Sequence, residues 1–325
     1  MIPIDPDSFK IKVALKVHLD NLTPILFGKV HALEAGQLKE FLTDQRIIDI
    51  LTDEPSHLET HHNQLLEFLN NYSRAEWETF FNYKRIVKRN RTDEQEELIT
   101  KYQELASKIE TIFKYKGGFE RKTSPYSTYD LAENLDFQTC VYCNRIYTKT
   151  VRNPSKITRP EFDHWFPKGT YPLLALSFYN LIPSCHVCNS SVKGSTVMNL
   201  NNYIHPYVDK SINMSFSYRL KKYSKYEFQI IRPLNSKEDN TIKAFKLEEI
   251  YLAHEDEIKD LLKIKKLYSI DYIIKLKKLI NQVDKNTSTK EIYRLAFGTH
   301  INESDFHKRP LSKMKKDILK ELNII

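Results

Sequence analysis

The sequence predicts an α+β protein that is mainly helical and has a zinc-stabilised domain at its centre. Three observations predict this class. Apolar residues recur at helical spacing before residue 120 and after residue 241, residues 216–230 contain two alternating apolar and polar runs, and all four cysteines fall in two Cys-x-x-Cys pairs. With 325 residues, 41% hydrophobic and 28% charged, the chain can bury a core, which excludes disordered and collagen-like classes.

The first 120 residues are expected to be mostly helical and to form an N-terminal region with a docking or regulatory role. Two apolar stripes at helical spacing support this expectation: Leu58, His62, Leu65, Leu66 and Leu69, and then Leu98, Tyr102, Leu105, Ile109 and Ile112. Thr92 and Gln95 have the spacing of a capping box and predict the start of the second helix.

Two polar features of this region have two interpretations each. The basic cluster Lys84, Arg85, Lys88, Arg89 and Arg91 either contacts phosphate or forms a solvated helix face, and the second is favoured. His57 and His61 have the i, i+4 spacing of metal ligands on a helix. Without a neighbouring carboxylate or cysteine pattern, we expect His57, His61 and His62 on an exposed polar face.

The pair Gly117-Gly118 predicts a boundary near residue 120. We therefore divide the chain into an N-terminal region 1–120, a central domain 121–210 and a C-terminal region 211–325. In the last region, Phe216, Tyr218 and Leu220, followed by Tyr226, Phe228 and Ile230, predict a β-hairpin. Helical spacing from Thr241 to Lys265, from Asp271 to Val283 and from Leu311 to Leu322 predicts a helical end.

The positive charge lies in the later part of the chain. The net charge is +8, and residues 211–325 alone contain 24 Lys and Arg against 16 Asp and Glu. This distribution favours a nucleic-acid partner, with solvated lysine faces as the alternative. No run approaches the roughly 18 apolar residues of a membrane span, and residues 1–7 lack a basic and an apolar secretion segment. We expect a cytoplasmic protein without membrane contact.

Four cysteines are too few for a disulfide scaffold, but Cys140, Cys143, Cys185 and Cys188 have the spacing of a tetrahedral structural Zn²⁺ site. The 41 residues between the pairs, 144–184, are more than a simple zinc ribbon needs. This insert contains Asp163-His164, a turn at Pro167 and Gly169, and Asn180, and Asn189 directly follows the second pair.

These residues resemble the HNH endonuclease family in its cysteine-framed form, over about residues 135–210. The resemblance implies a ββα-metal motif, in which two strands and a helix hold one divalent cation. By position, it implies that His164 is the general base that activates water, Asp163 a metal-binding carboxylate and Asn180 the residue that orients the base and its loop. Asn189 stands where the family has a histidine or an asparagine as metal ligand.

The chemistry of these residue types agrees with that resemblance. An unperturbed histidine titrates near 6.5, and phosphodiester hydrolysis needs such a base together with a hard cation. Carboxylate and amide oxygens suit Mg²⁺ or Mn²⁺, whereas thiolates select Zn²⁺. We expect Lys168, Arg145 and Lys193 to contact phosphate, consider His205 as a further site residue, and expect His186 to lie outside the zinc shell.

The stretch from Glu161 to Cys185, and Arg309-Pro310-Leu311-Ser312-Lys313 near the end, also look like the nucleases of Septu-type antiphage systems, the PtuB proteins. That resemblance implies a partner, a PtuA-like ATPase of the ABC/SMC kind. The sequence thus predicts a metal-dependent nuclease acting on DNA or RNA, with DNA favoured. The alternative is a zinc-ribbon binding or scaffold subunit that has lost catalysis.

Overall fold

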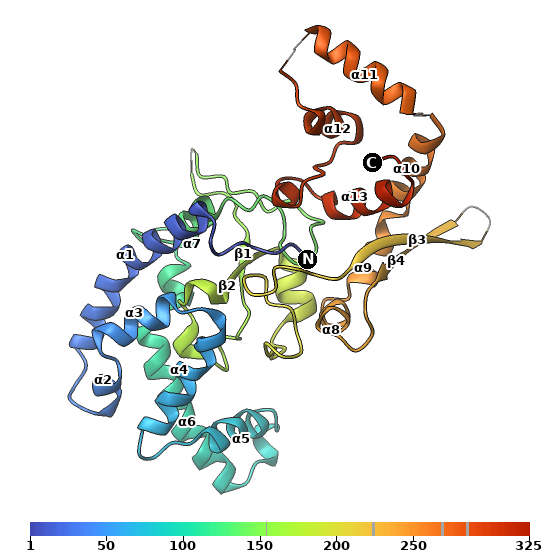
Figure 1. Ribbon diagram of the computed structural model, residues 1–325. Coiled ribbons are helices and arrows are strands. Elements are labelled where there is room, and N and C mark those ends of the chain that lie inside the picture. Colours follow the sequence, from blue (N-terminus) through green and yellow to red (C-terminus); the bar gives the residue numbers. More distant parts are fainter. Residues whose placement is uncertain (154, 223–224, 268–269, 284–285) are drawn as a thin grey trace.

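The computed structural model describes residues 1–325 except 154, 223–224, 268–269 and 284–285. It is mainly helical with two small antiparallel sheets, which confirms the predicted α+β class (Figure 1). No described helix combines the length and the apolarity that a membrane crossing requires. The segment around β1 and β2 lies between the N-terminal helices and the C-terminal helices and hairpin (Figure 1).

The N-terminal helices carry the periodic apolar faces that the sequence predicts. The longest, α1, buries Ile11, Ala14, His18, Leu22, Leu26 and Val30 along one side. Thr92 and Gln95 form the predicted capping box at the start of α6. The α-helices up to residue 135 are α1 (Phe9–His31), α2 (Gln37–Phe41), α3 (Asp44–Thr52), α4 (Pro55–Phe68), α5 (Arg74–Lys84), α6 (Asp93–Ile112) and α7 (Thr128–Leu135).

The expected exposed face of three histidines on α4 is wrong for two of them. His57 is exposed, but His61 and His62 are buried. His61 Nε2 lies 2.7 Å from Asp53 Oδ2, and the His62 ring packs edge-on against Trp77 and Tyr171. Aromatic neighbours from other segments surround the polar ring, which the sequence of α4 alone does not show.

The predicted hairpin is present as β3 (Ser215–Lys222) and β4 (Lys225–Ile231). The six apolar residues that predicted it face each other in three pairs: Phe216 with Ile230, Tyr218 with Phe228, and Leu220 with Tyr226. The helices that follow are α8 (Lys237–Ala244), α9 (Leu247–Tyr251), α10 (Glu255–Leu267), α11 (Ile270–Val283), α12 (Thr289–Phe297) and α13 (Ser312–Glu321). The helical stretch predicted from Thr241 is broken at Lys246, whose φ is +46°, and α12 was not predicted.

Buried apolar side chains from all three sequence regions form one connected core. It includes Leu65 of α4, Trp165 of the central segment and Phe245 after α8. The division into units at residues 120 and 210 stays a prediction. The continuous core does mean that the central segment is supported from both sides.

Candidate metal centre and active site

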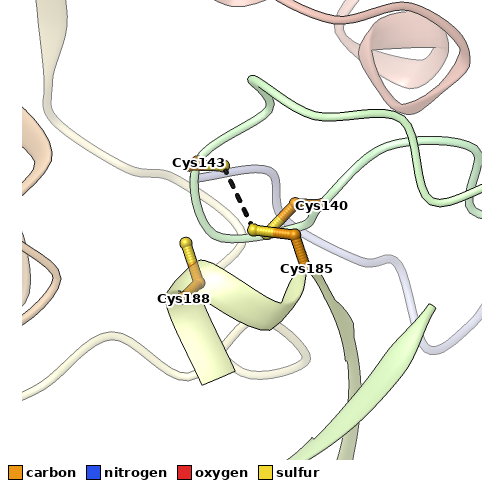
Figure 2. A group of neighbouring side chains, drawn as sticks. All are labelled: Cys140, Cys143, Cys185 and Cys188. Atoms are coloured by element: carbon orange, nitrogen blue, oxygen red, sulfur yellow. Dashed lines mark hydrogen bonds between the residues drawn. The ribbon is translucent and has the colours of Figure 1, made fainter. Parts of the chain in front are cut away.

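The four cysteines lie together, as the spacing predicted. Their sulfur atoms are all within 4.8 Å of one another, and the Sγ atoms of Cys143 and Cys185 are 4.0 Å apart (Figure 2). A disulfide needs about 2.05 Å, whereas four Zn–S bonds of about 2.3 Å separate tetrahedral sulfurs by roughly 3.8 Å. All four side chains are buried, and burial raises the pKa of the Cys140 thiol. Thiolates here need a compensating cation, so this donor set fits zinc.

The C-terminal region holds the first cysteine turn in place. Asn144, in the left-handed region at φ +50°, donates from Nδ2 to the carbonyls of Phe306 and Arg309. Its own carbonyl accepts from Leu311 N at 2.6 Å, and the Tyr251 hydroxyl donates to the Cys143 carbonyl. The segment around Arg309-Pro310-Leu311 therefore packs against the metal centre.

Asp163 and His164 end strand β1 (Glu161–His164), which pairs with β2 (Leu181–Ser184). His164 faces Leu181 in the register and Asp163 faces Ile182. His164 Nε2 lies 3.0 Å from the carbonyl oxygen of Ala175. A carbonyl only accepts, so Nε2 carries the proton and Nδ1 keeps its lone pair. Burial, and then the nearby Lys168, lower the pKa of His164 to about 3, so the ring is neutral at pH 7.

Asn180 fixes the loop between β1 and β2. It lies at the end of a 3₁₀ turn (Phe178–Asn180), and its buried side chain makes three hydrogen bonds to backbone. Oδ1 accepts from Phe166 N at 2.7 Å, and Nδ2 donates to the carbonyls of Phe166 (3.0 Å) and Leu174 (2.9 Å). Leu174 directly precedes Ala175 in the chain. The Asn180 side chain therefore also positions the Ala175 carbonyl, which accepts the hydrogen bond from His164 Nε2.

The N-terminal helices hold the same loop from outside. His18 of α1 donates from Nε2 to the Leu176 carbonyl at 2.8 Å, and Ser177 Oγ donates to the Ile50 carbonyl of α3 at 2.6 Å. The Trp77 indole of α5 donates to the Thr170 carbonyl. Sequence reasoning missed this support, since the partners of Leu176 and Ser177 lie more than 100 residues away in the chain.

Asp163 is engaged by two buried groups. The Lys193 ammonium donates to Asp163 Oδ1 at 2.9 Å and to the His164 carbonyl at 2.8 Å, and the Tyr142 hydroxyl donates to Asp163 Oδ2. Lys193 is 2% exposed. This placement disagrees with the expected phosphate contact, because the Lys193 ammonium group is buried and paired with the Asp163 carboxylate. Sequence spacing did not indicate this pairing.

Asn189 lies on the π-helix η5 (Val187–Lys193), and its Nδ2 donates to Glu161 Oε2 at 2.8 Å. Glu161 also contacts the exposed His186, whose Nδ1 lies 2.8 Å from Oε1. His186 is thus outside the cysteine cluster, as expected. Glu161 was not among the predicted site residues, although it faces the same side of β1 as Asp163.

The residues near β1 offer oxygen donors of the kind that a hard cation prefers. Asn189 keeps its amide oxygen free of any hydrogen bond found among the described residues, and each oxygen of Asp163 accepts one hydrogen bond where it has room for two. A cavity of about 300 Å³ is lined by Glu161, Asn189 and Lys168, among others. The donor chemistry fits Mg²⁺ or Mn²⁺. However, the described residues contain no second cluster of three His, Cys, Asp or Glu ligands.

The remaining predicted residues occupy different environments. Lys168 is exposed, with Nζ 5.5 Å from the centre of the Tyr115 ring. Arg145 is half-buried, with Nη1 3.2 Å from His254 Nε2. His205 is fully buried against Trp165 at a ring distance of 4.7 Å, and its Nε2 has no hydrogen-bond partner among the residues that the structure describes. His205 therefore packs in the core next to the site, and no hydrogen bond or ring pair joins it to His164 in the described part of the chain.

Comparison with known proteins gives two partial matches. Protein ea31 of Escherichia phage lambda is 32% identical over 103 residues, which are 30% of this chain and 31% of that protein. The Septu protein PtuB of Bacillus thuringiensis is 35% identical over 99 residues, 30% of this chain and 35% of that protein. The chain thus spans about a third of each relative. No protein-family model matches the chain, and no solved structure matches it.

Proposed function

We propose that the chain is a metal-dependent endonuclease of the HNH type that hydrolyses phosphodiester bonds in nucleic acid. The observation that carries the proposal is the placement of His164 at the end of β1. Its Nε2 is tied to the Ala175 carbonyl, its Nδ1 is left as an acceptor, and Asn180 holds the loop that supplies the carbonyl. Such a ring accepts a proton from an attacking water.

Each residue has a distinct task in this proposal. His164 accepts the proton at Nδ1. Burial lowers its pKa to about 3, so the ring is neutral at pH 7 but is a weaker base than the value near 6.5 that the sequence predicted. Asp163 and Asn189 hold Mg²⁺ or Mn²⁺, which when bound neutralises charge on the phosphate and the leaving oxygen. Asn180 orients the loop, and Cys140, Cys143, Cys185 and Cys188 hold structural zinc. Lys168 contacts the phosphate backbone from the exposed side.

The test is cleavage of plasmid DNA and of a defined RNA with and without Mg²⁺ or Mn²⁺. Cleavage should require the added metal and disappear in His164→Ala, while the zinc content stays unchanged. His186→Ala, which removes an exposed imidazole beside the same strand, is the matched control and should cleave. Activity that persists in His164→Ala would sink the mechanism.

We further propose that the nuclease acts in cytoplasmic antiphage defence together with a PtuA-like ATPase of the ABC/SMC kind. The partial similarity to the Septu protein PtuB supports this role. Co-expression of the chain with an ATPase encoded beside it should reduce phage plaque formation, and His164→Ala should abolish the reduction. Equal protection by His164→Ala would separate defence from cleavage.

One observation favours the alternative of a catalytically inactive zinc module that binds nucleic acid or the ATPase. Asp163 is occupied by Lys193 and Tyr142, and Asn189 contacts Glu161 rather than Asp163. This alternative predicts equal binding by wild type and His164→Ala and no strand scission by either protein.

A further inference from the structure

A second, larger cavity lies beside His164 and is built mainly by the N-terminal region. Its volume is about 580 Å³, and its walls come from the end of α6, the turn after it and the loop at 168–169. Tyr115, Lys116 and Lys168 line both this cavity and the one of about 300 Å³ beside Glu161. The two hollows therefore share a wall and lie side by side.

Three lysines give this double cavity its charge. Lys114, Lys116 and Lys168 are exposed. None of their ammonium groups has an ion pair or hydrogen bond to a residue that the structure describes; Lys168 only covers the Tyr115 ring. Three acidic residues also line the cavities, and two of them already have partners. Glu120 lies 3.5 Å from Arg159, and Glu161 contacts His186 and Asn189. Glu110 stays as an exposed carboxylate on the wall.

The turn after α6 is built to present the lysines. Gly117 has φ +69°, and a Cβ on Gly118 would lie 3.1 Å from Lys114 Cγ, so glycine lets the lysine stem cross the turn. The carbonyls of Thr111 and Ile112 at the end of α6 attract cations. Lys29 of α1 already donates to both, at 3.0 and 2.7 Å. Because Lys29 already binds these carbonyls, the Lys114 ammonium group is available to an anion.

The same turn touches the proposed base. The Tyr115 ring packs edge-on against the His164 ring at 4.5 Å. Ala175, whose carbonyl accepts from His164 Nε2, lines the larger cavity. An anion held by the lysines would therefore lie next to the ring that the proposed mechanism uses.

We propose that Lys114, Lys116 and Lys168 form a groove that binds the phosphodiester backbone of the nucleic-acid substrate and leads it to His164. The N-terminal region then supplies part of the substrate site. This inference rests on the proposed nuclease function for its substrate class, but its own evidence is the pair of cavities and the three ammonium groups that have no partner among the described residues.

The test measures binding separately from cleavage. Fluorescence anisotropy with labelled single-stranded and duplex DNA, without added Mg²⁺ or Mn²⁺ and over a range of salt, compares the full zinc-loaded chain with Lys114→Gln/Lys116→Gln/Lys168→Gln. Each lost phosphate contact lowers the slope of log K against log salt by about 0.7 to 0.9. We expect the slope to fall by about 2 to 3 and affinity at low salt to fall at least tenfold.

The matched control removes the same charge elsewhere. Arg85, Lys88 and Arg89 are exposed cations of the N-terminal region that do not line either cavity, so Arg85→Gln/Lys88→Gln/Arg89→Gln should bind like wild type. One single variant tests the groove further. Glu110→Gln removes a carboxylate from the wall and should strengthen binding.

The outcomes separate the two proposals. If the groove variant and its control lose binding equally, or if the groove variant keeps wild-type binding and salt slope, the groove is wrong even when His164→Ala abolishes cleavage. If the groove variant alone loses binding but wild type cleaves no substrate, the groove stands and the nuclease proposal fails.

Discussion

The ammonium group of Lys193 lies 2.9 Å from Asp163 Oδ1, and both side chains are almost completely buried, at 1% and 3% exposure. The pair joins η5 to β1, the two elements that carry Asn189 and the Asp163-His164 dipeptide. Lys193 also donates to the His164 carbonyl. The Lys193 ammonium group therefore fixes the end of β1, where the proposed base His164 lies.

Breaking this pair on one side should destabilise the protein strongly. Lys193→Met leaves the Asp163 carboxylate buried without its counter-charge, and such changes cost about 3 to 5 kcal/mol. Urea denaturation at pH 7 measures the loss. The double variant Asp163→Asn/Lys193→Met, which removes both charges, should recover most of the stability. A loss below about 1 kcal/mol in the single variant would show that the pair is not held as described.

The cysteine cluster predicts a linked loss of metal and structure. Cys140→Ser or Cys185→Ser should release the zinc and open residues 135–210, because metal binding supplies much of the folding free energy of small zinc sites. Zinc analysis and limited proteolysis measure the two effects. His186→Ala, directly beside Cys185, should keep one zinc per chain. Native stability and full zinc content in either cysteine variant would argue against a four-thiolate site.

Asn180→Ala should loosen the loop that ends at Ala175. The variant loses three hydrogen bonds at about 1 kcal/mol each, so we expect a loss of roughly 3 kcal/mol. Amide hydrogen exchange in residues 166–176 should become faster, while exchange in the distant hairpin stays unchanged. Asn180→Asp keeps the acceptor for Phe166 N but cannot donate to Phe166 and Leu174, and it should be at least as unstable. Unchanged exchange in the loop would contradict this role for Asn180.

Local patterns predicted local features of this protein well. The Thr92 capping box, the paired apolar residues of the hairpin and the convergence of two Cys-x-x-Cys motifs all depend on residues close in sequence or on a metal that joins them. The sequence could not show which groups meet from distant elements. Lys193 was expected to contact phosphate, but its ammonium group instead donates from η5 to Asp163 of β1. The contact of His18 with Leu176 spans 158 residues and left no local signal.

Buried histidines predict that the protein loses stability as the pH falls. Burial lowers the pKa of His62 to about 3 and that of His18 to about 4, against 6.5 in the unfolded chain. Below pH 6.5 the unfolded state therefore binds protons that the folded state excludes, and each such group costs up to about 1.4 kcal/mol per pH unit. The contribution of each neutral histidine to the free energy of unfolding is complete above pH 6.5. It decreases as the pH falls, until the pH reaches the pKa that the histidine has in the folded protein.

His62→Phe tests this dependence directly. Neither ring nitrogen of His62 has a hydrogen-bond partner in the described parts of the chain, and phenylalanine can keep the edge-on contacts with Trp77 and Tyr171. Urea denaturation between pH 7 and pH 4.5 should show a slope that is shallower than wild type by about 1.4 kcal/mol per pH unit below pH 6. Loss of zinc at low pH affects both proteins and cancels in this comparison. His57→Phe, an exposed position on the same helix, should keep the wild-type slope. An identical slope in His62→Phe and wild type would mean that His62 is not held neutral in the core.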